Sequence, residues 1–186
     1  MLGRIPGIGV RRLRTLVSFF GDPLAVRRAT TAGIASIPGF NARLAAEVHR
    51  FFRNTMLAEA EREAVRQLSL LRDAGGEILH VWDPRYPPQL AAIYDAPPVL
   101  FTRGDTACGS GPCVAVVGTR HPTPYGLVMA EYFARELGTA GVTVVSGLAR
   151  GVDTRAHAAA LASGGRTIAV IGTGPDRCYP RENIRL

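Results

Sequence analysis

The sequence predicts an α/β protein in which a small all-helical domain precedes a doubly wound parallel sheet. In the second half of the chain, three short apolar segments each end in a glycine loop, and a helix-forming stretch follows the first two. Strands that alternate with helices at this spacing form parallel sheets. Residues before the Gly75-Gly76 pair carry helical patterns, so we expect domains over 1–75 and 76–186.

The excess positive charge of the chain lies in its first 54 residues. The formal net charge is +7, and this segment holds nine arginines against Asp22 and Glu47. Residues 55–186 hold thirteen arginines and thirteen acidic residues. Such an asymmetry is typical of a segment that binds nucleic acid.

A weak internal repeat lies in the same segment. Ile-Pro-Gly-Ile-Gly over residues 5–9 and Ile-Pro-Gly-Phe-Asn over residues 37–41 each precede a predicted helix. This is the helix-hairpin-helix pattern, whose glycine amides contact a phosphate without reading a base. Asn41 replaces the second closing glycine, and we expect that copy to be structural, with Asn41 capping its helix. The first copy predicts a secondary DNA contact through Gly7, Gly9, Arg11, Arg12 and Arg14.

The middle of the chain connects the two parts. Residues 42–74 have the apolar spacing of one long helix, which ends at the Gly75-Gly76 pair. Residues 83–98 contain five prolines. We expect this second stretch to be a stiff connection and not a flexible tail.

The first strand–loop–helix unit covers residues 114–140. An apolar run over 114–117 predicts a buried parallel strand, Gly118 begins the loop, and a helix follows over 125–140. A glycine loop before a helix presents unpaired backbone N–H groups and the positive end of the helix dipole, which together suit a phosphate. Arg120 adds a charged donor to this loop.

Two further units repeat this design. A strand over 142–145 leads into a loop over 146–153 and a helix that ends near residue 162, and a strand over 166–171 ends in Gly-Thr-Gly. The carboxyl ends of parallel strands meet at one edge, so we expect Arg120 and Arg150 to share a crevice. We expect Asp153 to cap its helix. His157 fits a position on the helix face better than a catalytic base.

A dinucleotide-binding enzyme is the main alternative for such loops, and the residues argue against it. Its fingerprint needs a second glycine where Arg120 stands, and a third where Arg177 follows Gly172 and Gly174. No nucleophile–base pair, paired carboxylates or metal-ligand spacing accompanies the loops. We therefore expect a phosphate-binding protein that is not an enzyme, with no catalytic residues, metal or cofactor.

Taken in order, three segments resemble the DNA-processing protein A family, also called DprA or Smf. They are GTRHPTPYG, SGLARGVDTRAH and GGRTIAVIGTGPDRCYPRENIRL, and the similarity covers residues 83–186. The resemblance implies an extended Rossmann domain behind a sterile-alpha-motif-like domain. By position it implies that Arg120 and Arg150 contact DNA phosphates. The remaining pocket residues it implies are Gly118, Thr119, Ser146, Gly147, Gly151, Gly172 and Gly174.

The resemblance also implies a function and partners. The family binds single-stranded DNA, protects incoming DNA in natural transformation and helps to load the RecA recombinase. Its dimer and RecA surfaces lie largely beyond the position of Leu186, so we expect a partial sequence of a homodimeric protein. The alternative is a nucleotide-processing enzyme similar to the lysine-decarboxylase-like phosphoribohydrolases, although their PGGxGTxxE motif is absent up to Leu186.

The remaining features bear on the location of the protein. Cys108, Cys113 and Cys178 are odd in number and lack CxxC spacing, as is usual for reduced thiols. No signal peptide or long apolar span is present. We expect a cytoplasmic protein without a membrane partner.

Overall fold

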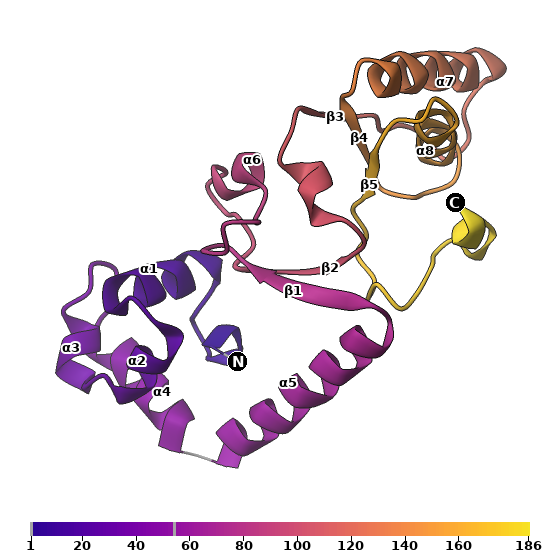
Figure 1. The fold of residues 1–186 in the computed structure, drawn as a ribbon. Helices are drawn as coiled ribbons and strands as arrows, with labels where there is room; N and C mark the ends of the chain where they lie inside the picture. The colour runs from indigo at the N-terminus through magenta and orange to yellow at the C-terminus, as the bar shows by residue number, and fades with distance from the viewer. Residues whose placement is uncertain (1, 54) are drawn as a thin grey trace.

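The computed structural model describes residues 2–53 and 55–186. Figure 1 shows three parts in chain order: a cluster of short helices, a long helix that leads to an antiparallel hairpin, and a small parallel sheet with two helices. Among the described residues, no helix combines the length and the hydropathy that crossing a bilayer requires.

The helical cluster is held by one apolar core and by side-chain caps at its helix starts. Its core includes Leu16, Ile34 and Val48, which are fully buried. Asp22 and Thr30 accept backbone N–H groups at the first turns of α2 (Pro23–Arg28) and α3 (Thr31–Ala35), as N-cap residues do. The elements are η1 (Leu2–Arg4), α1 (Val10–Phe20), α2 (Pro23–Arg28), α3 (Thr31–Ala35) and α4 (Ala42–Arg53).

The two Ile-Pro-Gly segments form the same tight turn. The N–H of Ile8 donates to the carbonyl of Ile5 (3.0 Å), and that of Phe40 to Ile37 (2.9 Å). The glycine inside each turn has φ of +81° or +85°, which suits glycine at the third position of a turn. Asn41 Oδ1 accepts the Leu44 N–H at 2.9 Å, as the sequence predicts for a cap. The helix-hairpin-helix assignment stays a prediction.

The stretch predicted as one long helix is divided into two. The helix α4 ends at Arg53, and α5 runs from Thr55 to Asp73 in another direction, away from the cluster and toward the hairpin (Figure 1). Asn54 lies outside the described residues. The apolar period is local and continues through both helices, so it does not reveal a change of direction.

The connection rich in proline lies within an antiparallel hairpin. Strands β1 (Gly76–His80) and β2 (Val99–Arg103) pair from Gly76 opposite Arg103 to His80 opposite Val99. Between them lies α6 (Pro88–Ala91). The buried Tyr86 donates its hydroxyl to the carbonyl of Pro97 at 2.7 Å, which fixes the loop. The boundary near residue 75 stays a prediction.

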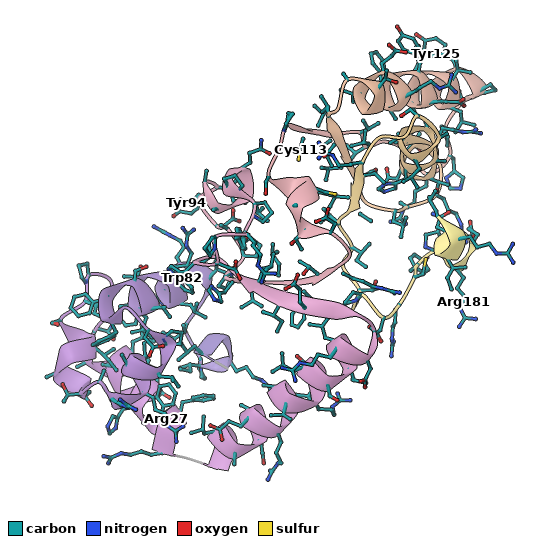
Figure 2. The ribbon with its side chains drawn as sticks, in the orientation of Figure 1. Arg27, Trp82, Tyr94, Cys113, Tyr125 and Arg181 are labelled. Carbon is teal, nitrogen blue, oxygen red and sulfur yellow. The ribbon has the colours of Figure 1, made fainter. Side chains whose placement is uncertain are left out.

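A contact between Arg11 and Tyr94 connects the helical cluster to this loop. The guanidinium of Arg11 lies 4.3 Å from the ring centre of Tyr94. Figure 2 shows Tyr94 and Trp82 on the hairpin side that faces α1. Stacking of this kind between an arginine and an aromatic ring is favourable at a surface.

The parallel sheet has the strand order β3-β4-β5. Its strands are β3 (Cys113–Ala115), β4 (Thr143–Ser146) and β5 (Thr167–Ala169), preceded by the short turn η2 (Thr106–Gly109). The helices α7 (Pro124–Thr139) and α8 (Val152–Ala162) connect successive strands, and the turn η3 (Arg181–Arg185) follows.

Both connecting helices lie on the same face of this sheet (Figure 1). Each connection carries the chain one strand further in the same direction. A doubly wound sheet needs a reversal of direction, which places helices on the second face. The described residues contain no such reversal, so the predicted double winding is not seen in them.

The prediction of a buried first strand is wrong. Val114 is 42% exposed and Val117 is 69% exposed. The strand β3 is at the sheet edge, and within the described part of the chain no long helix covers the face opposite α7 and α8. An apolar run predicts burial only where neighbouring elements cover it.

The two helices approach closely because their contact residues are small. Ala134 on α7 and Ala156, Ala159 and Ala160 on α8 form a buried cluster with Val144 of the central strand. This packing fixes both helices against β4. It thereby sets the positions of the loops that precede them.

Candidate phosphate-binding crevice

The three predicted glycine loops meet at the carboxyl edge of the parallel sheet. A hollow of about 270 Å³ opens between them. Its walls come from the loop after β3, the loop between β4 and α8, and the segment after β5. The lining residues are Arg120, Gly147, Ala149, Arg150, Ile171, Gly172, Thr173, Tyr179 and Pro180.

The structure brings Arg120 and Arg150 to this one hollow, as expected from the strand ends. Both side chains are exposed. Within the described residues, Arg120 makes no ion pair, whereas Arg150 is paired with Glu182. The two guanidinium groups therefore differ within the described structure: that of Arg150 is already bonded to a carboxylate, and that of Arg120 is not.

Close contact between two loops places these arginines together. A Cβ atom on Gly118 would lie 2.8 Å from the Val152 side chain, and one on Gly151 would meet the backbone of Thr119. The Val152 N–H donates to the Thr119 carbonyl at 3.3 Å. Gly151 also has φ of +81°, a conformation that favours glycine. These glycines thus shape the crevice from behind its lining.

The loop between β4 and α8 is held by an internal carboxylate. Asp153 Oδ2 accepts the N–H groups of Gly147 (3.1 Å) and Ala149 (3.3 Å) and is buried. The N-cap position of α8 is Gly151, so the prediction that Asp153 caps the helix is wrong. The glycine-loop pattern predicts unpaired backbone N–H groups, but those of Gly147 and Ala149 are already bonded to Asp153.

Two further side chains fix the same loop. Asn183 donates to the carbonyl of Leu148 at 2.9 Å, and the Thr154 hydroxyl donates to the carbonyl of Ala149 at 2.7 Å. Leu148 has φ of +56°, the one positive value that a non-glycine residue shows in the described chain. Because these bonds hold a strained conformation, the loop presents Arg150 from a fixed backbone.

Arg150 is engaged by a carboxylate on the neighbouring segment. Its Nε and Nη2 atoms donate to the two oxygens of Glu182 at 2.6 and 3.0 Å. These bonds raise the pKa of Arg150 and lower the pKa of Glu182, so both stay charged at neutral pH. The pair is more than half exposed, so water screens it.

Of the nine predicted pocket residues, Arg120, Gly147, Arg150 and Gly172 line the hollow. The other five do not: Gly118, Thr119, Ser146, Gly151 and Gly174. The Ser146 hydroxyl donates to the Val116 carbonyl at 2.7 Å and ties β4 to the end of β3. The Thr119 hydroxyl oxygen accepts the His121 N–H at 3.1 Å, which closes the loop.

Sequence reasoning missed the contribution of the segment after the third loop. Tyr179 and Pro180 line the hollow, Glu182 pairs with Arg150, and the buried Asn183 anchors the segment. The sequence signal for this contribution was an acidic residue, Glu182, followed by an amide, Asn183, in the third segment that resembles the family. A single sequence does not show that they fold back onto a loop 32 residues earlier.

The hollow combines cationic and apolar surface. Its lining, within the described residues, contains two guanidinium groups, a hydroxyl, a phenol, backbone and the apolar side chains of Ala149, Ile171 and Pro180, and it includes no carboxylate, imidazole or thiol. Across residues 2–53 and 55–186, no group of three or more potential ligand side chains is placed to hold a metal ion. The arrangement suits binding of a phosphate through charge-assisted hydrogen bonds.

His157 belongs to the core of α8 and not to this hollow. It is 1% exposed, and its Nδ1 lies 2.6 Å from Thr167 Oγ1. The Thr167 hydroxyl donates its proton to the Val144 carbonyl, so Nδ1 is the donor in this pair. Nε2 has no partner within the described structure, and burial lowers the pKa of the imidazole.

The predicted secondary contact lies on the helical cluster, at the other end of the molecule from the parallel sheet (Figure 1). Gly7 and Gly9 are exposed at the first turn. Arg12 Nη1 donates to the Gly7 carbonyl at 2.8 Å, Arg11 stacks on Tyr94, and Arg14 is half-buried. The three arginines thus do not form one free cluster.

The fold and the crevice place the chain in a class: α/β proteins in which glycine loops surround a hollow at the carboxyl edge of a parallel sheet. Comparison with known proteins gives the family. The profile of DNA recombination-mediator protein A matches residues 77–186. DNA processing protein DprA of Bacillus subtilis is 42% identical over 122 residues, which are 65% of this chain and 41% of that protein.

Two solved structures are also similar. DprA from Streptococcus pneumoniae superposes with a TM-score of 0.73 and 32% identity, over 98% of this chain and 59% of that one. DprA from Helicobacter pylori, described for its single-stranded DNA binding mode, gives a TM-score of 0.51 and 35% identity over 58% of this chain and 47% of that one.

The chain therefore belongs to the DNA recombination-mediator protein A family, also named DprA or Smf. It spans 41% of the length of the Bacillus subtilis relative. The resemblance noted in the sequence is thereby confirmed.

Proposed function

We propose that this protein binds single-stranded DNA by its phosphate backbone in the crevice at the sheet edge. The observation that carries the proposal is the convergence of Arg120 and Arg150 on one hollow. Guanidinium groups bind phosphate oxygens through two parallel hydrogen bonds. Backbone contacts position a strand without reading its sequence, so binding is expected to be independent of sequence.

The rim of the crevice favours a single strand. Tyr179 lines the hollow and is 63% exposed, so its ring is accessible to an unstacked base. Aromatic side chains beside a basic groove are the usual way in which proteins hold single strands without sequence preference. The H. pylori relative, described for binding single-stranded DNA, supports the same assignment.

The cellular role that we propose is that of a recombination mediator. On this proposal the protein protects incoming single strands in natural transformation and passes them to the RecA recombinase, as a homodimer when complete. Membership in the family supports this role. RecA and the second subunit are partners proposed from the family alone.

We further propose that the crevice binds its ligand without chemical change. The described lining includes no carboxylate, imidazole or thiol, and the carboxylate beside it, that of Glu182, is bonded to Arg150 through both oxygens. A phosphoribohydrolase activity would need a carboxylate at the hollow that is free to act on the substrate, whereas that of Glu182 is engaged by Arg150. Incubation with nucleoside monophosphates, followed by chromatography for a released base, is expected to yield none.

The experiment that tests DNA binding is an anisotropy titration of the protein with labelled oligo-dT and with a duplex of equal length. We expect tighter binding of the single strand. Each neutralised phosphate releases a counterion, so the affinity is expected to fall steeply as salt rises. Equal affinity for both ligands, or binding that salt leaves unchanged, would contradict the proposal.

A further inference from the structure

We propose that Glu182 is an internal competitor for phosphate at Arg150, which makes the crevice favour a DNA strand over a single phosphate. The observation is the two-point contact of Arg150 Nε and Nη2 with both carboxylate oxygens of Glu182. A carboxylate in this geometry uses the donors that a phosphate would use. The DNA part of this inference rests on the proposed function.

The competitor is held in place by the segment that carries it. The neighbouring Asn183 is buried and donates from Nδ2 to the Leu148 carbonyl (2.9 Å) and to Thr154 Oγ1 (2.8 Å). Leu148 belongs to the loop that also presents Arg150. The backbone segments that carry Glu182 and Arg150 are therefore tied to each other.

The ion pair between Arg150 and Glu182 is strong enough to oppose phosphate binding and weak enough for a phosphate of DNA to displace it. The side chains of Arg150 and Glu182 are 57% and 55% exposed, and exposed ion pairs contribute little net stability. The hydrogen bonds from Arg150 lower the pKa of Glu182, so its charge persists at neutral pH. A phosphate at Arg150 must then either displace Glu182 or accept a like charge beside it.

This arrangement discriminates between ligands by the number of their contacts. A single phosphate meets two guanidinium groups whose charge is partly cancelled by Glu182. A strand makes further contacts along its backbone, so it can displace the carboxylate at one position and still bind. Free phosphate and mononucleotides would thus not occupy the site that DNA uses.

The variant that tests the idea is Glu182→Gln, which removes the charge and keeps one acceptor for Arg150. The matched control is Glu131→Gln on α7. Glu131 is also paired with arginines, at 2.6 Å to Arg135 and 3.3 Å to Arg155, but it does not line the hollow. Both variants raise the net charge by one, so a difference between them is local in origin.

Two ligands separate this inference from the proposed function. The first is labelled oligo-dT, followed by anisotropy, and the second is inorganic phosphate, followed by thermal unfolding at constant ionic strength. We expect Glu182→Gln to bind oligo-dT about three- to ten-fold more tightly than wild type, as expected for freeing one guanidinium contact. We expect Glu131→Gln to change the affinity for oligo-dT by less than about two-fold. Phosphate should stabilise Glu182→Gln more than it stabilises wild type.

If Glu182→Gln binds both ligands as wild type does, or more weakly, the competitor role is overturned. The carboxylate would then act to orient Arg150. If no protein binds oligo-dT while phosphate stabilises Glu182→Gln more than wild type, the DNA function fails and the competitor stands. Circular dichroism of each variant verifies that it is folded.

Discussion

Arg120 offers the sharpest test of the crevice, because in the described structure it lines the hollow and makes no ion pair. Arg120→Ala removes one guanidinium from the site. The backbone loop there is held by the Val152 N–H and by the closely packed Gly151, neither of which involves the arginine side chain. The substitution is therefore expected to leave the fold intact.

The magnitude follows from the state of each arginine. A free guanidinium that donates to a phosphate contributes about 1.5–3 kcal/mol, or roughly ten- to a hundred-fold in affinity. Arg150 already shares its donors with Glu182 and gains less on binding. Replacing Arg150 with alanine should lower the affinity for oligo-dT only about three- to ten-fold. The reason is that Arg150 exchanges Glu182 for a phosphate on binding and does not gain an additional partner.

The assay is an anisotropy titration with oligo-dT at four salt concentrations. Loss of one phosphate contact should lower the slope of log affinity against log salt by about 0.7 for a single strand. Arg120→Lys should recover part of the affinity, since lysine keeps the charge without the planar fork. If Arg120→Ala and Arg150→Ala both fold and bind as wild type with an unchanged slope, the crevice is not the DNA site.

Two other regions give predictions of their own. Replacing Arg11, Arg12 and Arg14 with alanine should weaken oligo-dT binding modestly and leave the preference over duplex unchanged, because this surface attracts DNA only through its charge. Abolished binding would make the helical cluster the main site. Burial lowers the pKa of His157 below that of the unfolded chain, so the free energy of unfolding should fall as pH drops below about 6.5. His157→Asn should reduce the difference in the free energy of unfolding between pH 5.5 and 7.5, measured by urea titration. A difference equal to that of wild type would refute the role of His157.

The elements that the sequence predicts best are those with strong local signals. The predicted helix over 125–140 corresponds to α7 (Pro124–Thr139), where Thr123 accepts the Gly126 N–H as an N-cap and Pro124 begins the helix. The predicted end of α8 near residue 162 also agrees. Caps, prolines and glycines act within a few residues, so a single sequence contains the information that they carry.

The predictions that failed depend on what lies opposite an element. The run over 114–117 has the composition of a buried strand, yet β3 is at an edge. The period over 42–74 is helical throughout, yet α4 and α5 run in different directions (Figure 1). Figure 2 shows Tyr125 on the outer side of α7, where its side chain is exposed, so residue type alone does not indicate burial there either.

The crevice illustrates a more specific limit. Loop composition placed Arg120 and Arg150 at one edge, because the carboxyl ends of parallel strands must meet. It did not reveal which donors are already occupied: Asp153 holds the amides of Gly147 and Ala149, and Glu182 holds Arg150. The capacity of the site to bind phosphate depends on the donors that these internal anions leave free. Arg120 is the less engaged of the two guanidinium groups in the described structure, so the affinity for DNA should be more sensitive to Arg120 than to Arg150.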